Sequence, residues 1–173
     1  MIRRRLLLIL PIIVLSIALD QGTKALARAL LPPHTVHLLG DLVRLQLSEN
    51  VGAFLSLGAG LPPMIRFLIF TVASSILVIA VIVYTTLERE LSQDMVIALA
   101  FVAGGGLSNL IDRVTREGRV VDFLNFGIGN LRTGILNVAD IFITFGALYV
   151  IWAGIRGARE ERSPPFDGGD DSV

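Results

Sequence analysis

The sequence predicts an all-α integral membrane protein with four transmembrane helices. Of its 173 residues, 53% are hydrophobic and 17% are charged, and the mean hydropathy is +0.72, a more apolar composition than soluble domains have. Four apolar segments are each long enough to cross a hydrocarbon core of about 30 Å as a helix. Strands cannot replace them, because isolated strands leave backbone groups unpaired in lipid and the chain lacks the sustained alternation of a barrel.

The predicted helices cover residues 6–31, 64–84, 95–111 and 138–155. Asp20 and Lys24 interrupt the first of them. A secretory signal peptide is the alternative for this segment, because a run of three arginines precedes it. No small-x-small cleavage site follows, however, and three more spanning segments come after it. We therefore interpret it as a retained helix.

Residues 1–157 are thus predicted to form one integral-membrane domain. The arginines at positions 3–5 favour a cytoplasmic N-terminus, and an even number of spans then returns the C-terminus to the cytoplasm. The total loop charge does not decide the orientation, because both sides carry equal numbers of basic residues. Residues 158–173 are rich in charged residues, Gly and Pro, and are predicted to be a disordered cytoplasmic tail.

Two longer segments remain on the outer side. The stretch Val36–Leu47 ends in the alternation of a half-buried strand and is followed by a glycine-rich run, which predicts a small sheet at the membrane surface. The segment 115–134 mixes Arg, Gly and Phe and carries Asp122. It is predicted to be a loop that lies against the interface.

The composition also excludes several classes of function. A formal net charge of zero with scattered basic residues argues against a nucleic-acid partner. The chain has no cysteine, so it has no thiolate metal site and no cysteine nucleophile. His34 and His37 are too few for a histidine metal centre, have no acidic partner near them in the sequence, and are expected to be surface residues. No metal and no cofactor are predicted, which leaves carboxylate chemistry.

Polar residues gather at one end of the predicted helices, the outer end. Asp20 and Lys24 are spaced for an i,i+4 ion pair, which would serve either as an anchor or as support for a site. Asn109, Asp112 and Arg113 share one helix face and would be either a buried brace or part of the chemistry. The glycines at positions 104–106 lie inside an apolar helix, so they indicate close helix packing rather than a phosphate loop.

Asp122 and Asp140 are the candidate catalytic residues. A carboxylate at the edge of a membrane is costly and points to function, and Asn137 is placed three residues before Asp140 to orient it. Two carboxylates that share a site separate each other's pKa values. One can then act as a base toward water while the other donates a proton to a carbonyl.

Five motifs together resemble lipoprotein signal peptidase, also called signal peptidase II, over residues 3–157. They are Asp20-Gln21-Gly22-Thr23-Lys24, Glu49-Asn50-Val51-Gly52-Ala53-Phe54, Gly104-Gly105-Gly106-Leu107-Ser108-Asn109-Leu110-Ile111-Asp112-Arg113, Val120-Val121-Asp122-Phe123 and Leu136-Asn137-Val138-Ala139-Asp140. The resemblance implies a membrane aspartyl peptidase that removes signal peptides from prolipoproteins, cutting before a diacylglyceryl-modified cysteine with an Asp dyad and an activated water.

The resemblance also implies roles, surroundings and partners. Asp122 and Asp140 would be the dyad, the outer sheet would be the family's β-cradle, and the loop carrying Asp122 would be its lid-like helix. The protein would be a monomer in the bacterial inner (plasma) membrane, its active site at the outer face, and its partners would be lipidated prolipoprotein signal peptides and membrane lipids. The supporting and substrate-binding positions would be Asp20, Lys24, Asn50, Gly52, Asn109, Asp112, Arg113 and Asn137.

Two positions depart from the family pattern. Ser108 replaces a usual glycine, and the stretch after Gly52 reads Ala-Phe-Leu-Ser rather than Ala-Ala-Phe-Ser. We expect neither change to touch a carboxylate, so only fine packing should differ.

Two other functions are compatible with polar groups in membrane helices. A proton-coupled transporter or channel would place them near the middle of the bilayer and often has an internal repeat, whereas here they lie at helix ends and no repeat is visible. A non-enzymatic scaffold would use its acids only to pair with Arg and Lys. It predicts that Asp122→Asn and Asp140→Asn abolish no reaction.

Overall fold

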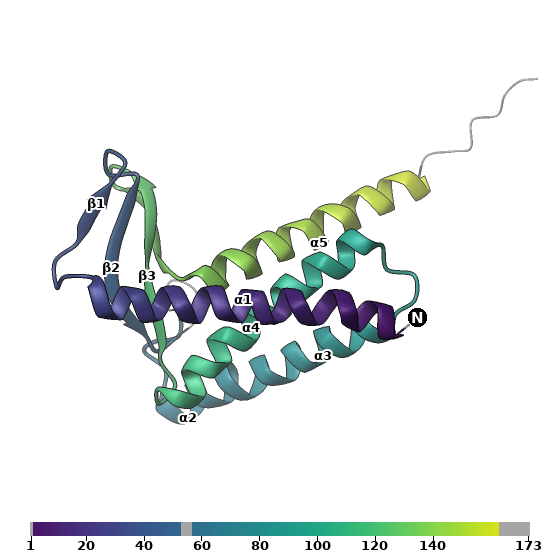
Figure 1. Ribbon diagram of the computed structural model, residues 1–173, viewed down its shortest axis with the longest axis horizontal. Coiled ribbons are helices and arrows are strands. Elements are labelled where there is room, and N and C mark those ends of the chain that lie inside the picture. Colours follow the sequence, from purple (N-terminus) through teal and green to yellow (C-terminus); the bar gives the residue numbers. More distant parts are fainter. Residues whose placement is uncertain (1, 53–56, 163–173) are drawn as a thin grey trace, which may run out of the picture.

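The computed structural model describes residues 2–52 and 57–162, and it contains the four predicted membrane helices (Figure 1). The first is α1 (Ile2–Leu30). The second is one continuous rod of α2 (Pro63–Arg66), the π-helical segment η2 (Phe67–Ala73) and α3 (Ser74–Leu87). The third is α4 (Gln93–Thr115) and the fourth is α5 (Val138–Arg162). Each rod is long and apolar enough to cross a membrane.

The helix ends reach beyond the apolar segments. Helix α4 begins two residues before the predicted range, because Ser92 caps its start by accepting a hydrogen bond from the Met95 amide. It ends four residues after the predicted range, because its last turn carries polar site residues. Helix α5 runs to Arg162, into the stretch predicted as a tail. The rest of that stretch, residues 163–173, lies outside the described residues.

Helix α4 is the centre of the bundle and packs against α1, α3 and α5. Its three consecutive glycines each face a different helix. A Cβ added at Gly104 would lie 2.7 Å from the Cβ of Ser16 on α1, one at Gly105 2.6 Å from the carbonyl oxygen of Ala139 on α5, and one at Gly106 2.6 Å from Val78 on α3. The predicted role of these glycines in close helix packing is confirmed.

A four-stranded antiparallel sheet crosses one end of the bundle (Figure 1). Its order is β1 (Val36–Leu38), β2 (Val43–Asn50), β3 (Val120–Ile128) and β4 (Leu131–Leu136). The predicted strand in the first outer segment is therefore confirmed, and it pairs with a hairpin that comes from the second outer segment.

Residues 115–134 were predicted to form a loop, and the resemblance implied a lid-like helix there. Both expectations are wrong for β3 and β4, which are strands. Asp122 is on a strand, not on a loop. The two strands are rich in Val, Ile, Leu and Phe, which fit a half-buried sheet, and a turn at Gly129, with φ +56°, joins them. The arginines and glycines in this segment hid that pattern.

Candidate active site

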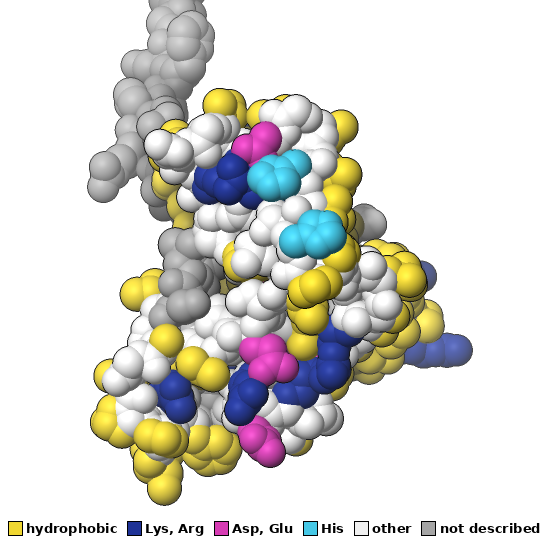
Figure 2. Space-filling model, turned by 90° about the vertical axis from the view of Figure 1, so that its left-hand side faces the viewer, with side chains coloured by type: hydrophobic (Ala, Val, Ile, Leu, Met, Phe, Trp, Pro, Cys, Tyr) yellow, Lys and Arg dark blue, Asp and Glu magenta, His cyan; other side chains and the backbone are white. Residues whose placement is uncertain are grey.

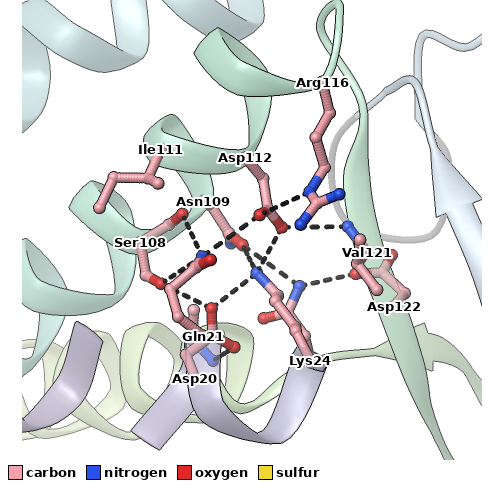
Figure 3. Close-up of polar contacts among 12 residues, drawn as sticks. Asp20, Gln21, Lys24, Ser108, Asn109, Ile111, Asp112, Arg116, Val121 and Asp122 are labelled. Carbon is pink, nitrogen blue, oxygen red and sulfur yellow. Dashed lines mark hydrogen bonds and ion pairs between the residues drawn. The ribbon is translucent and has the colours of Figure 1, made fainter. Parts of the chain in front are cut away.

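The predicted polar residues converge at the end of the bundle that the sheet covers. Figure 3 shows Asp20, Lys24, Asn109, Asp112 and Asp122 among them. Helix α1 supplies Asp20 and Lys24, and β3 supplies Asp122. The remaining members come from α4, from β2, and from the start of α5 and the residue before it. They are Asn109, Asp112, Arg113, Asn50, Asn137 and Asp140.

Lys24 lies at the centre of this cluster and is only 1% exposed. Its Nζ is 2.6 Å from Asp20 Oδ2 and 2.9 Å from Asp112 Oδ2, and it donates to Asn109 Oδ1 at 3.0 Å. An ammonium has three donors, so all of them are used. The predicted Asp20–Lys24 ion pair is confirmed. It is buried, and Lys24 also binds Asp112 and Asn109, so the pair braces α1 against α4.

Asp20 also fixes the position of α5. Its Oδ1 accepts a hydrogen bond from the Ala139 amide at 2.9 Å, in the first turn of that helix, where backbone donors lack helical partners and a negative charge is favoured. Its Oδ2 accepts one from the Ser108 hydroxyl at 2.7 Å. The expectation that Ser108 touches no carboxylate is thus wrong. The second departure, at residues 53–56, lies outside the described residues.

Asp112 connects α4 to the strand that carries Asp122. Its Oδ2 accepts a hydrogen bond from the Val121 amide at 3.1 Å, and its Oδ1 accepts from Gln21 and Arg116, both at 3.2 Å. Gln21 and Arg116 were not predicted as site residues. The i,i+4 spacing of Arg116 from Asp112 is a signal that could have identified it, whereas no local spacing connects Gln21 with Asp112.

Asn137 and Asp140 form a reciprocal cap at the start of α5. Asn137 Oδ1 accepts from the Asp140 amide at 2.9 Å, and Asp140 Oδ2 accepts from the Asn137 amide at 3.2 Å. This is the geometry of a capping box, here with Asn and Asp in place of the usual pair. The local sequence Asn-Val-Ala-Asp therefore holds one oxygen of the Asp140 carboxylate by a contact within the same helix turn.

Asn109 orients the other oxygen of Asp140. Because its Oδ1 faces the donor-only ammonium of Lys24 at 3.0 Å, its Nδ2 is directed to Asp140 Oδ1, at 2.9 Å. Asn109 Oδ1 also accepts from Asn137 Nδ2 at 3.2 Å. The lysine thus positions the Asp140 carboxylate through an asparagine.

Asp122 is 2% exposed and accepts two side-chain hydrogen bonds. Asn137 Nδ2 donates to its Oδ1 at 2.6 Å and Asn50 Nδ2 to its Oδ2 at 3.0 Å. Burial, followed by the charge of Asp140, raises the pKa of Asp122 to about 6 against the lowering effect of these bonds and of Lys24. Asn137 therefore contacts both acids, with its side chain on Asp122 and its backbone on Asp140.

Arg113 and Gly52 meet at the side of the cluster. Arg113 NH2 donates to the Gly52 carbonyl at 3.0 Å, and its buried Nε has no partner within the described residues. Arg113, Asn109 and Asp140 line the polar end of a groove between α3, α4 and α5. The apolar part of this groove is lined mainly by Leu77, Val78, Val81, Val102, Ala103 and Ile143.

The described residues contain no group of three His, Cys, Asp or Glu side chains placed to hold a metal ion. Two of the four acids in the cluster, Asp20 and Asp112, are paired with Lys24. The other two, Asp122 and Asp140, lie with several amide donors beside a groove. Such a set can activate a water and bind a carbonyl.

The sequence is similar to a large group of bacterial proteins. Residues 12–156 match the family model described as signal peptidase (SPase) II. A protein of Sphingopyxis alaskensis named lipoprotein signal peptidase is 38% identical over 77% of this chain and 76% of its own length. Relatives with the same name occur in Bifidobacterium adolescentis (34%, 87% of this chain and 77% of its own) and in Syntrophus aciditrophicus (31%, 92% and 99%).

Two solved structures, both described as bacterial membrane enzymes determined by the in meso method, share the fold. One superposes with a TM-score of 0.76 at 24% identity, over 90% of this chain and 92% of its own. The other has a TM-score of 0.70 at 26% identity, over 84% and 90%. With the four membrane helices, the small sheet and a match over residues 12–156, the chain belongs to the signal peptidase II family of aspartic-type lipoprotein signal peptidases.

Proposed function

We propose that Asp122 and Asp140 are the catalytic dyad of this peptidase. The observation that carries the proposal is their common contact with Asn137, whose side-chain amide binds the carboxylate on the strand and whose backbone amide binds the carboxylate on the helix. The raised pKa of Asp122 supports it, because Asp140 contributes to that rise, as expected when two acids share a site. The proton belongs to the pair rather than to one residue.

In this mechanism the ionised carboxylate takes a proton from a water, which attacks the scissile carbonyl carbon. The protonated carboxyl donates a hydrogen bond to the carbonyl oxygen, which stabilises the charge that develops there. When the tetrahedral intermediate collapses, the C–N bond breaks and the leaving nitrogen takes up a proton from the dyad. The dyad returns to its singly protonated state, and no covalent intermediate forms.

The groove between α3, α4 and α5 fits the proposed substrate. Its apolar walls would hold the membrane-embedded part of a prolipoprotein signal peptide, while Asp140 and Arg113 at its polar end face the bond to be cut. Arg113 lines this polar end, and its guanidinium would supply a donor for a substrate carbonyl. Cleavage would occur just before the diacylglyceryl-modified cysteine, whose lipid keeps the substrate in the bilayer.

We further propose that the enzyme acts as a monomer in the bacterial inner (plasma) membrane, with both termini in the cytoplasm and the sheet at the outer face. The location of the polar cluster at one end of the bundle favours an interfacial peptidase over a transporter, whose polar groups would lie near the middle of the bilayer.

The test is cleavage of a purified diacylglyceryl-modified prolipoprotein in detergent, with and without EDTA. Wild-type protein should cut before the lipidated cysteine in both conditions. Asp122→Asn and Asp140→Asn should each lose cleavage by at least about a thousandfold while keeping the thermal unfolding midpoint within a few degrees of the wild type. Glu117→Gln, at an acid whose side chain is 89% exposed, is the control and should cut normally.

If both Asn variants still cut, the dyad assignment is wrong. If the wild type cuts only without EDTA, the metal-free mechanism is wrong. If a folded wild-type protein never cuts, the scaffold or transporter interpretation replaces the peptidase.

A further inference from the structure

The two faces of the sheet differ in chemistry. Residues that pair across antiparallel strands point to the same face. One row consists of Leu38, Val43 and Phe126. The neighbouring row on the opposite face consists of His37, Arg44 and Asn125 in the first three strands and ends at Ile135 in β4. A third row, again apolar, consists of Val36, Leu45, Leu124 and Leu136. Across β1, β2 and β3, the sheet therefore has one apolar face and one polar face.

The apolar face is directed toward the membrane helices. Leu45 lines an open apolar groove together with Leu26, Ala27 and Leu30 of α1. Leu26 and Leu30 are themselves 59% and 74% exposed, on a helix that spans the membrane. The apolar face of the sheet thus continues the lipid-facing surface of α1. The opposite face carries charged and histidine side chains, with hydrophobic ones along its edges (Figure 2).

The charges on that outer face are paired with one another. Asp41 accepts hydrogen bonds from Arg44 at 2.7 Å, and its Oδ1 lies 2.6 Å from His37 Nδ1, so the expectation that His37 has no acidic partner is wrong. These contacts, chiefly that with Arg44, hold the pKa of Asp41 well below its usual range. Arg132 donates to the Asp41 carbonyl at 2.8 Å. This ion cluster suits water or headgroups, not hydrocarbon.

The far end of the sheet carries the three most exposed large hydrophobic residues of the described part of the chain, Leu39, Ile128 and Leu131. The β1–β2 turn presents Leu39 and Leu42, which are 75% and 48% exposed, and the β3–β4 turn is flanked by Ile128 and Leu131, which are 75% and 85% exposed. The two turns are adjacent, because the Gly127 amide donates to the Leu42 carbonyl at 3.0 Å. This end, which we call the sheet tip (residues 38–43 and 126–131), projects past the first turn of α5 (Figure 1).

We propose that the apolar side chains of the sheet tip rest in the outer lipid leaflet and anchor the sheet to the membrane surface, while the Asp41 carboxylate, held by His37 and Arg44 of the polar row, stays at the headgroups. An exposed apolar cluster on a membrane protein, at the end where the helices leave the bilayer and continuous with a lipid-facing helix, fits hydrocarbon better than water. Because β2 and β3 carry Asn50 and Asp122, the anchor would hold this half of the site at a fixed depth.

The chain has no cysteine, so single-cysteine variants labelled with a nitroxide can measure depth directly. His37→Cys and Leu38→Cys are a matched pair, since the two residues are adjacent on β1 and point to opposite faces. Leu131→Cys reports on the tip. Leu148→Cys, on the exposed surface of α5, is the lipid reference. Collision rates with oxygen and with a water-soluble nickel chelate are recorded in phosphatidylethanolamine and phosphatidylglycerol liposomes.

We expect labels at positions 38 and 131 to resemble the one at 148, with an oxygen-to-nickel collision ratio at least about fivefold above that at position 37. Equal, water-like ratios at 37, 38 and 131 would overturn the anchor. Low collision rates with both reagents at 38 and 131 would also overturn it, because they would mean that protein, such as a second copy, covers the tip. The measurement needs no peptidase activity, so its outcome is independent of the proposed reaction.

Discussion

Lys24 is the residue on which the geometry of the site depends most. Its ammonium compensates two buried carboxylates, those of Asp20 and Asp112, and fixes the amide of Asn109. Taking one charge out of such a buried set leaves the others uncompensated, which costs about 3–5 kcal/mol. Arg116 binds Asp112 from outside at 3.2 Å, with 29% of its side chain exposed. Its removal leaves Asp112 paired with Lys24, so the loss should be near that of an exposed ion pair, at most about 1 kcal/mol.

We therefore predict that Lys24→Met lowers the free energy of unfolding by about 3–5 kcal/mol, whereas Arg116→Met lowers it by no more than about 1 kcal/mol. Both would be measured by thermal or denaturant unfolding in the same detergent, since both replace a long cation by the same apolar side chain. Equal losses in the two variants would contradict the central role of Lys24.

Asp122 should make stability depend on pH. Its pKa is raised from 3.8 to about 6 in the folded chain, so the folded state binds the proton more tightly than the unfolded state. Its contribution to stability is therefore present in full below pH 3.8 and is lost as the pH rises through about 6. A shift of this size corresponds to at most about 3 kcal/mol.

The expected result is a change in the stability difference between Asp122→Asn and the wild type. Relative to the wild type, the variant should gain about 1–2 kcal/mol between pH 4.5 and pH 7.5, because only the wild type ionises residue 122 over that range. Unfolding midpoints at several pH values measure this directly. Parallel curves for the two proteins would show that the pKa of Asp122 is not raised.

Short-range spacing predicted some of these residue contacts and not others. The Asp20–Lys24 pair could be read from the sequence because its members are one helical turn apart. The bond from Ser108 to Asp20 joins residues 88 positions apart, and no local pattern indicates it. The same limit explains why Gln21 was overlooked.

At the scale of elements, the start of α5 combines a structural and a chemical role in Asn137. Its Oδ1 caps the helix, while its Nδ2 binds Asp122 and Asn109. Serine is an equally good helix cap but has no amide. Asn137→Ser should thus keep the unfolding midpoint close to that of the wild type while cleavage falls at least tenfold. Asn137→Ala should lose activity and about 1 kcal/mol of stability as well. Equal unfolding midpoints for the two variants would contradict the cap.

Helix α4 approaches α5 closely at Gly105, which gives a second prediction. A methyl group there would meet the Ala139 carbonyl oxygen at 2.6 Å, whereas at Gly22 of α1 nothing lies within 4 Å. Gly105→Ala should push the start of α5 away and lower both stability and cleavage. Gly22→Ala should be neutral or stabilising by up to about 1 kcal/mol, because alanine favours helix. Unfolding and cleavage assays on the pair decide this, and a harmless Gly105→Ala would exclude close packing.

Helices were easier to predict than strands in this chain. A run of some 20 apolar residues indicates a membrane helix almost by itself, so all four helices were located. The β3–β4 hairpin was missed because Asp122, Asn125 and Gly127 interrupt the apolar pattern of β3. The Gly129–Asn130 turn between two apolar strands was the available signal.

At the scale of the whole molecule, the buried network joins α1, α4, α5 and the sheet across one end of the bundle. Asp20 reaches α5, Asp112 reaches β3, and Lys24 connects the two acids. The sheet is therefore held at one end, while the N-terminus and the last turn of α5 lie at the opposite end (Figure 1). Because the described residues contain four helices that can span a membrane, the start of α1 and the end of α5 face the same compartment when all four cross it.

The orientation of this asymmetric molecule is the last prediction. The arginines at positions 3–5 favour the cytoplasm for the end with the termini, which puts the sheet outside. In intact bacterial cells, a membrane-impermeant maleimide should label Glu117→Cys, beside the sheet, and should spare Gly157→Cys, near the end of α5, until the cells are opened. Each site accommodates the change, since the Glu117 side chain is 89% exposed and nothing lies within 4 Å of a Cβ at Gly157. The reverse labelling pattern would place the polar cluster in the cytoplasm, where a peptidase that acts on exported lipoproteins could not meet its substrate.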